Sequence, residues 1–209
     1  MTKTKEAVRA VFLEFSTKFE GAIPWIYLDV KGFATVGLGC LLEPAGLAQS
    51  LPFVIRGTET KATPDQITRD WVTVKRNRLL AHQGAQRARF YTDLDLPKEG
   101  IEQLAWHRLH LNEHYLLEHA FPMFGDFPAD AQLAIHSMSW ACGAGFPEFF
   151  PKFTRAAQAR DWVTCAKECK IRETNNPGLK PRNWANRKLF TKLAEVGSSF
   201  DPEKLYGWP

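Results

Sequence analysis

The chain has 209 residues, of which 44% are hydrophobic and 24% charged, and its formal net charge is +4. This length suits one compact domain or a domain of two lobes, with a core large enough to need no disulfide. No apolar run approaches the roughly 18 residues that a membrane-spanning helix needs. The mild positive charge fits an ordinary protein surface or attraction to an anionic polymer such as a bacterial cell wall, and we expect no nucleic-acid partner.

The first predicted element is a helix that ends at Glu20. Its apolar positions recur at spacings of three and four residues, as on one face of a helix, namely Val8, Val11, Phe12, Phe15 and Phe19. Gly21 and Pro24 follow and disfavour further helix, so Glu20 lies in the last turn.

A short hairpin is predicted next, with strands over Trp25–Leu28 and Phe33–Leu38. Asp29 is placed where the first strand meets the turn, and Thr35 lies on the returning strand. Glycines at 37 and 39 leave that strand without bulky side chains, as expected where a backbone or a ligand comes close.

Two carboxylates and a hydroxyl are therefore predicted around one hairpin. Cleavage of a glycosidic bond needs one carboxyl group that gives a proton to the leaving oxygen and a second, ionised one that stabilises the sugar cation or activates water. Glu20 is the candidate acid, Asp29 the candidate ionised partner, and Thr35 could share its water. A Glu–Gly pair at a helix end before an Asp-containing turn also occurs in proteins without such chemistry.

Residues 44–63 are rich in Pro, Gly, Ser and Thr and are predicted to form a connector with little secondary structure. Thr63 caps the following helix, Pro64 fits its first turn, and we expect this helix to join a small hairpin lobe to a larger helical lobe. A run of basic residues follows, which either faces a polyanion or forms a solvated face: Lys75, Arg76, Arg78, Arg87 and Arg89.

A further helix is predicted from Pro97 to about Phe121. It contains His110, Glu113 and His114 in an H-x-x-E-H pattern, which in zinc peptidases supplies two metal ligands and a base. No downstream residue clearly provides a third ligand, and His107 and His119 show that this helix is simply rich in histidine. A zinc peptidase is therefore the weaker alternative, and we expect no metal and no other cofactor.

Helices are also predicted from about Phe127 to Trp140, over 149–159 and over 161–171. The first runs into the glycine-rich segment Ala141–Phe146, which could line a binding groove or be only a helix cap and turn. Near the end, Gly178–Phe190 contains Arg182 together with Asn183 and Asn186.

The order Glu-Gly, eight residues, Asp, five residues, Thr-x-Gly-x-Gly resembles the phage-type lysozymes of glycoside hydrolase family 24. That resemblance places the family's catalytic residues on Glu20, Asp29 and Thr35, and Tyr27 and Gly32 also fit. Cys40 stands where the family often has His. The resemblance further aligns Trp140 and Gly143 with a cleft-wall element and Arg182 with a closing arginine, whereas Ala141, Asn183 and Asn186 depart from it. The candidate substrate-binding residues are Leu41, Trp140, Gly143 and Arg182.

The resemblance implies an α+β, mainly helical lysozyme-like fold in a single domain over 1–209. We expect a hairpin lobe with its connector over about 19–60 and a helical lobe from 1–18 and about 64–209, joined by a long helix. The implied activity is muramidase cleavage of peptidoglycan glycan strands. The alternative is a lysozyme scaffold that binds these strands without cutting them.

An amphipathic helix follows the basic N-terminal residues, so we predict no signal peptide. We expect a monomer made in the cytoplasm that reaches the periplasm or cell wall after lysis or through a secretion apparatus. It would then be either a phage endolysin or a secreted antibacterial effector, and an effector would have a cognate immunity protein.

Overall fold

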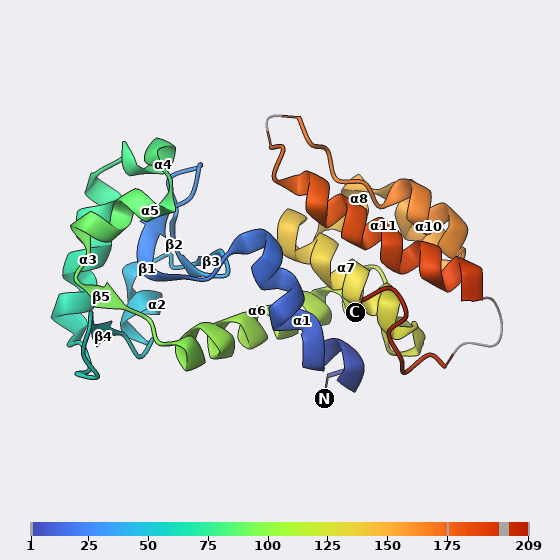
Figure 1. Ribbon diagram of the computed structural model, residues 1–209, viewed down its shortest axis with the longest axis horizontal. Helices are drawn as coiled ribbons and strands as arrows, with labels where there is room; N and C mark the ends of the chain where they lie inside the picture. Colours follow the sequence, from blue (N-terminus) through green and yellow to red (C-terminus); the bar gives the residue numbers. More distant parts are fainter. Residues whose placement is uncertain (1, 175, 197–200, 209) are drawn as a thin grey trace. The chain divides into compact units, whose positions relative to one another are not determined.

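A computed structural model describes residues 2–174, 176–196 and 201–208 (Figure 1). The predicted α+β class is confirmed, since 59% of the described residues are helical and the strands form small antiparallel sheets. The chain divides into two compact units. Unit 1 comprises Met1–Phe19 and Leu109–Pro209, and unit 2 comprises Glu20–Arg108.

A three-stranded antiparallel sheet contains the predicted hairpin, in unit 2. Its strands β1 (Ile23–Leu28), β2 (Ala34–Gly37) and β3 (Cys40–Leu41) follow one another in chain order. Thr35 is the register partner of Tyr27 on β1 and of Leu41 on β3. Directly paired residues of antiparallel strands point to the same face, so these three side chains form one row across the sheet.

The connector after the hairpin contains more regular structure than predicted. It forms the short helix α2 (Ala45–Gln49) and strand β4 (Val54–Ile55). β4 pairs with β5 (Leu94–Asp95), which lies about forty residues further along the chain. Local composition cannot reveal such a pairing, because the hydrogen-bond partner is distant in sequence.

Helix α3 (Pro64–Arg76) begins as predicted, with a capping box. The Thr63 side chain accepts a hydrogen bond from the Gln66 amide, and the Gln66 side chain accepts one from the Thr63 amide. Two short helices and a 3₁₀ turn complete this part of unit 2, namely α4 (Leu80–Gln83), α5 (Ala85–Ala88) and η1 (Arg89–Tyr91).

The division into units differs from the expected lobes. Residues 64–108 group with the hairpin, whereas they were expected in the helical lobe, and α3 lies wholly within unit 2. The boundary falls inside the 22-residue helix α6 (Lys98–His119), between Arg108 and Leu109. The physical reason is packing, because α3 buries Ile67 and Val74 and contacts β1 and β2.

Unit 1 is helical and is built around α7 (Ala129–Cys142). Every residue of α7 from Ala129 to Trp140 is buried, so other elements surround this helix on all sides. The other elements of the unit are α1 (Glu6–Glu20) as far as Phe19, the second half of α6, η2 (Phe124–Asp126), α8 (Phe146–Phe149), α9 (Pro151–Gln158), α10 (Trp162–Glu168) and α11 (Leu179–Val196).

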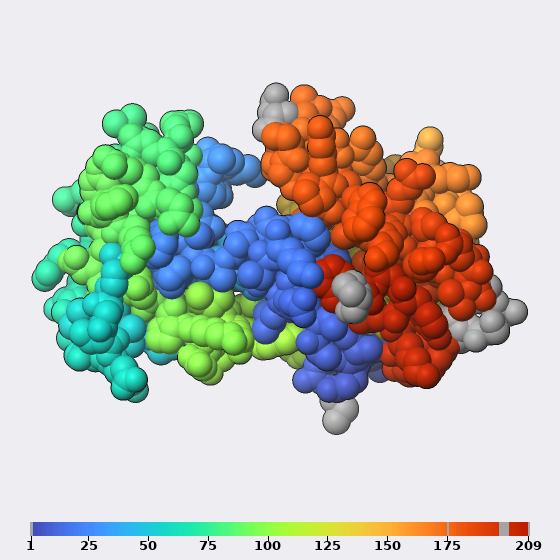
Figure 2. Space-filling view, viewed as in Figure 1, coloured from blue at the N-terminus to red at the C-terminus, as the bar shows by residue number. Residues whose placement is uncertain are grey.

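The C-terminal segment packs onto the start of unit 1, where red and blue atoms meet in Figure 2. The buried Asp130 carboxylate accepts hydrogen bonds from the amides of Tyr206 and Gly207, at 2.8 and 2.7 Å. Trp208 lies edge-on to Phe15, with ring centroids 4.8 Å apart. In the described part of the chain, no helix combines the length and apolarity needed to cross a lipid bilayer.

Candidate functional site

Glu20 ends α1, and the backbone changes direction directly after it. Gly21 has φ +69°, a left-handed conformation that favours glycine and stops the helix. The Glu20 carboxylate then lies against the turn between β2 and β3, since its Oε2 is 3.5 Å from where a Cβ on Gly39 would be. Gly39 also has φ +73°, so a side chain there would strain the backbone, whereas its Cβ would meet Glu20 only at an ordinary van der Waals distance.

Asp29 closes the turn of the hairpin. Its Oδ1 accepts hydrogen bonds from the backbone amides of Lys31 and Phe33, at 2.9 and 2.8 Å. The Asp29 amide in turn donates to the Phe33 carbonyl at 2.9 Å. These bonds fix the direction of the carboxylate through the backbone, which is how Asp commonly stabilises a turn.

Lys75 of α3 braces this turn from outside the hairpin. Its ammonium group donates to the Gly32 carbonyl at 2.9 Å and to Glu43 at 2.6 Å. Glu43 also accepts from the Ala34 amide at 2.9 Å. Burial raises the pKa of Glu43, but the Lys75 and Ala34 hydrogen bonds and the Lys75 charge outweigh burial and lower that pKa overall. Lys75 therefore ties α3 to the hairpin, and its ammonium group is engaged there instead of on the predicted basic face.

Tyr27 is the member of the Tyr27, Thr35 and Leu41 row that responds to the two carboxylates. Burial raises the pKa of the Tyr27 phenol, and the charges of Glu20, Cys40 and Asp29 raise it further, against Arg108, which lowers it. The charges of both carboxylates therefore reach the Tyr27 phenol.

Thr35 and Leu41 differ in their exposure. Thr35 is 4% exposed and its hydroxyl donates to the Phe33 carbonyl at 3.0 Å, whereas Leu41 is 52% exposed. Leu41 therefore offers an apolar surface next to the site. The Thr35 hydroxyl must exchange the Phe33 carbonyl for another partner before it can donate to a water or a sugar.

Arg108 also contacts the region around Glu20 and Tyr27, although the sequence pattern did not indicate it. Its Nη1 donates to the Gly39 carbonyl at 2.7 Å, which holds the turn against which Glu20 lies. Burial raises the pKa of the Cys40 thiol, and Arg108 only partly opposes this. Cys40 is thus a buried neutral thiol. No local signal predicts Arg108, because it comes 69 residues after Gly39 on α6.

Two of the predicted substrate-binding residues, Trp140 and Arg182, are buried in unit 1, with exposures of 3% and 2%. Trp140 packs edge-on to Phe12 at 5.3 Å. Arg182 donates to the Ser137 carbonyl at 2.9 Å and lies over the Phe19 ring at 5.0 Å. Little of either side chain can meet a ligand, so both have a packing role here.

Gly143 and the two asparagines also lie in unit 1. Gly143 ends α7 with φ +89° and has open space around its missing side chain. Asn183 binds the backbone amide and carbonyl of Ile171. Asn186 is fully buried, and its side-chain amide has no hydrogen-bond partner among the residues that the structure describes.

The H-x-x-E-H residues do not form a common site. His110 and His114 are exposed, and His114 pairs with Glu118 at 3.2 Å. Glu113 is instead buried, where it accepts hydrogen bonds from the side chains of Thr2 and Thr4 and from the amide of Lys3. Within residues 2–174, 176–196 and 201–208, no three His, Cys, Asp or Glu side chains are grouped to hold a metal ion.

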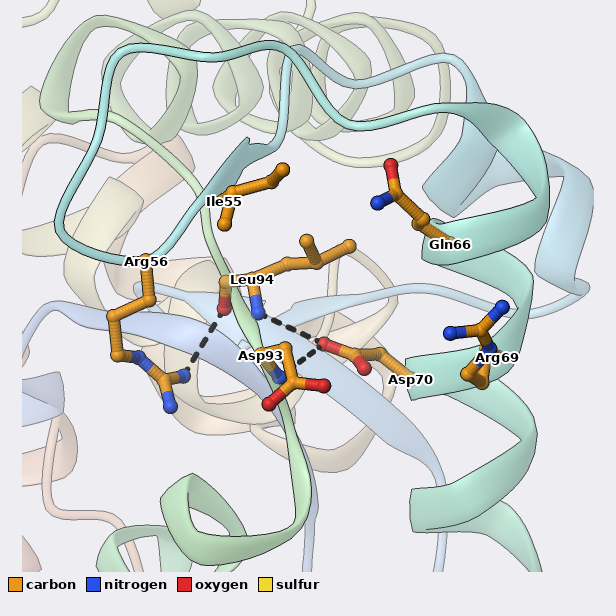
Figure 3. Close-up of a pocket in the computed structure, with 7 residues that line it drawn as sticks. All are labelled: Ile55, Arg56, Gln66, Arg69, Asp70, Asp93 and Leu94. Carbon is orange, nitrogen blue, oxygen red and sulfur yellow. Dashed lines mark hydrogen bonds between the residues drawn. The ribbon is translucent and has the colours of Figure 1, made fainter.

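A separate pocket of about 410 Å³ in unit 2 is shown in Figure 3. Asp70 of α3 reaches from its wall and accepts hydrogen bonds from the amides of Asp93 and Leu94, at 2.9 and 3.0 Å. Burial raises the pKa of Asp70 to about 6. Asp70 thereby ties α3 to strand β5.

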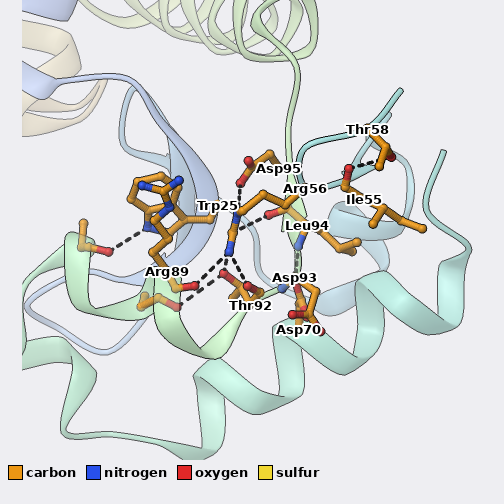
Figure 4. Close-up of polar contacts among 12 residues, drawn as sticks. Trp25, Ile55, Arg56, Thr58, Asp70, Arg89, Thr92, Asp93, Leu94 and Asp95 are labelled. Carbon is orange, nitrogen blue, oxygen red and sulfur yellow. Dashed lines mark hydrogen bonds and ion pairs between the residues drawn. The ribbon is translucent and has the colours of Figure 1, made fainter. Parts of the chain in front are cut away.

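Arg56 makes a second set of contacts beside this pocket, as Figure 4 shows. Its guanidinium binds Asp95 at 3.0 Å, the Thr92 carbonyl at 2.6 Å and the Leu94 carbonyl at 3.2 Å. These partners occupy most of its donors, so Arg56 joins the segments around β4 and β5 and has little capacity left for a ligand.

The chain matches no protein-family model and no curated protein sequence.

Proposed function

We propose that the protein is a muramidase with a lysozyme-like fold, which hydrolyses the β-1,4 bond between N-acetylmuramic acid and N-acetylglucosamine in peptidoglycan. The observation that carries the proposal is that both carboxylates lie at turns of one small sheet within unit 2: Glu20 lies against the turn that follows β2, and Asp29 closes the turn that precedes it. One carboxyl group ends a helix and the other is held by a turn, so each has its own rigid support.

In this mechanism Glu20 protonates the glycosidic oxygen as the bond to the anomeric carbon breaks. Asp29 stabilises the developing positive charge or orients the attacking water. Thr35 holds that water once its hydroxyl turns from the Phe33 carbonyl. Arg108 and Lys75 do not touch the sugar in this scheme; they hold the two backbone turns that position Glu20 and Asp29.

The biological setting follows from the substrate. A peptidoglycan hydrolase acts on the cell wall, so this protein would work either as a phage endolysin or as an antibacterial effector delivered by a secretion apparatus. An effector would require an immunity protein in the producing cell. A gene neighbour encoding a holin would favour the endolysin, whereas a small neighbour targeted to the periplasm would favour the effector.

The direct test is the release of reducing ends from purified peptidoglycan by wild-type protein and by Glu20→Gln. General acid catalysis contributes ~10²–10⁴-fold to such reactions, so the variant should lose activity by about that factor. Glu14→Gln is the matched control, because Glu14 is an exposed carboxylate on the same helix. Equal activity of wild type and Glu20→Gln would refute the proposal.

A second candidate is a non-catalytic module that binds peptidoglycan. The burial of Thr35 and its bond to the Phe33 carbonyl favour this candidate, because the buried hydroxyl has already donated its only proton and cannot donate it to an attacking water. Sedimentation with insoluble peptidoglycan separates the two functions. A binding module would sediment with the polymer and release no reducing ends.

A further inference from the structure

A groove on unit 1 lies between α10 and α11, which run side by side in Figure 1. Its cavity volume is about 400 Å³, within the range of small-molecule sites. The face of α11 that lines it carries Lys180, Trp184 and Arg187, at the spacing of three and four residues that places side chains on one side of a helix. Lys167 and Lys170 line it from the side of α10.

Positive charge dominates this groove. Four cationic side chains line it, against the single carboxylate of Glu173, and that carboxylate is already engaged by Lys170 at 3.7 Å and by Asn183 at 3.0 Å. In the described part of the chain, Lys180 and Arg187 have no carboxylate within 4.0 Å. Cations gathered without matching anions repel one another, so their arrangement favours an anionic ligand.

The position of Lys180 strengthens this argument. It lies in the first turn of α11, which contains no acidic residue. The helix dipole is positive at this end, so a cation there is electrostatically unfavourable unless an anion is bound. Residues that are electrostatically unfavourable in their local structure occur preferentially at functional positions.

Trp184 adds a flat apolar wall to the groove. Its side chain is 67% exposed, which is unusual for a residue of this size, and Lys188 lies 5.6 Å from its ring. An exposed indole beside cations can stack on the ring of a ligand while the cations hold its charge.

The floor of the groove is preformed. The Asn183 side chain is 7% exposed, accepts a hydrogen bond from the Ile171 amide at 2.9 Å and donates one to the Ile171 carbonyl at 2.8 Å. The segment that follows α10 is thereby fixed to α11. A ligand would meet a shaped site and would not have to order it, which lowers the entropic cost of binding.

We propose that this groove binds a small phosphorylated ligand that contains a ring, with Lys180 and Arg187 on the phosphate and Trp184 stacked on the ring. Sugar phosphates and nucleotides share this chemistry. The site is independent of the hairpin carboxylates, so this proposal does not rest on the hydrolase activity.

Calorimetric titration of the full chain tests the site with three probes: inorganic phosphate, N-acetylglucosamine 1-phosphate and uridine monophosphate. At least one ring-containing probe should bind more tightly than inorganic phosphate, and its affinity should fall with added salt. Tighter binding of the sugar phosphate or of the nucleotide shows which of these two classes of ligand the groove prefers. Absence of binding by all three probes would overturn the proposal.

The decisive variant is the double substitution Lys180→Glu and Arg187→Glu, which should weaken binding at least about tenfold, because charge-assisted hydrogen bonds to the phosphate are lost. A glutamate near the start of α11 suits the helix dipole, so this variant should remain folded. The matched control is Lys152→Glu with Arg155→Glu on α9, which makes the same change in net charge. Equal weakening in both double variants would show general attraction only and would overturn the site.

Trp184→Ala tests the stacking separately. It should reduce the affinity for the ring-containing probe to that of inorganic phosphate and leave phosphate binding unchanged. An unchanged preference for the ring-containing probe in this variant would overturn the assignment of Trp184.

Discussion

Each unit contains a set of carboxylate and hydroxyl groups, and the two sets differ in their surroundings. In unit 2, Glu20, Asp29 and Thr35 surround a hairpin whose neighbouring side chain, Leu41, is half exposed. In unit 1, Glu113 and Thr4 lie in the interior, and the Thr4 hydroxyl also contacts Nε2 of His136 at 2.7 Å. The same functional groups therefore form the candidate site in one unit and hold the interior together in the other.

The difference lies in how the carboxylates are satisfied. Glu113 accepts hydrogen bonds from Thr2, Lys3 and Thr4, so both of its oxygens are used to hold the N-terminal segment. Burial alone would raise the pKa of Glu113, but these bonds outweigh burial and lower it. A carboxylate so enclosed stabilises the fold and cannot reach a substrate. Substitutions should therefore affect activity at the hairpin and stability at Glu113.

The largest expected effect on stability comes from Glu113→Gln. The amide replaces an acceptor oxygen with a donor that faces hydroxyl and amide donors, so the unfolding free energy should fall by about 3 kcal/mol. Urea unfolding measures this, with exposed Glu118→Gln on the same helix as control. Asp29→Asn keeps the Oδ1 acceptor of the turn and should cost about 1 kcal/mol or less. A larger loss at Asp29 than at Glu113 would break the comparison.

Acidification should also weaken unit 1 through His136. Complete burial lowers the pKa of His136 to about 4, from 6.5 for an exposed histidine, although the Glu113 charge opposes this. The unfolded state therefore binds this proton more tightly than the folded state does. The contribution of neutral His136 to the unfolding free energy is complete above pH 6.5 and is lost as the pH falls toward 4. The loss should reach about 3 kcal/mol.

Urea unfolding of wild type and His136→Gln across this pH range isolates the contribution of His136. The variant has no titratable side chain at position 136, so its stability should depend less on pH than that of wild type. Parallel pH profiles of the two proteins would contradict the assignment.

Asp70 of unit 2 should have the opposite pH dependence. Because of burial, its pKa in the folded protein is about 6, above the ordinary aspartate value of 3.8. The contribution of protonated Asp70 to the unfolding free energy is therefore complete below pH 3.8 and is lost as the pH rises toward 6. This loss should be about 1–2 kcal/mol after screening by solvent. In Asp70→Asn this loss should disappear from urea unfolding curves, and its persistence would assign it to another group.

The smallest effect is expected for Lys75→Met. Methionine retains much of the apolar stem but cannot bind Gly32 or Glu43, so the Asp29 turn should loosen. We expect kcat for peptidoglycan cleavage to fall about tenfold, because a misplaced catalytic group costs rate. Lys31→Met, on the exposed part of the same turn, is the control. A loss confined to KM would indicate a role in binding.

Much of the local structure could be predicted because its causes lie within a few residues of one another. The end of α1 at Glu20, the Asp29 turn and the Thr63 cap each depend on a glycine, an Asx turn or a capping box. The predicted connector over 44–63 was wrong in part, since β4 requires β5 as its partner. The expected division into lobes also differed, because α3 packs on the sheet of the hairpin.

The sequence by itself determined which residue types could perform the chemistry and where the helix and turn that carry them begin and end, because these depend on short-range backbone preferences. Only the tertiary structure decided which of them are accessible. It buried Glu113 against Thr2 and Thr4, and it placed Arg108 beside Gly39. In both cases the partners are far apart in the sequence. Burial and partnership are set by contacts between distant segments, and residue spacing along the chain does not encode them.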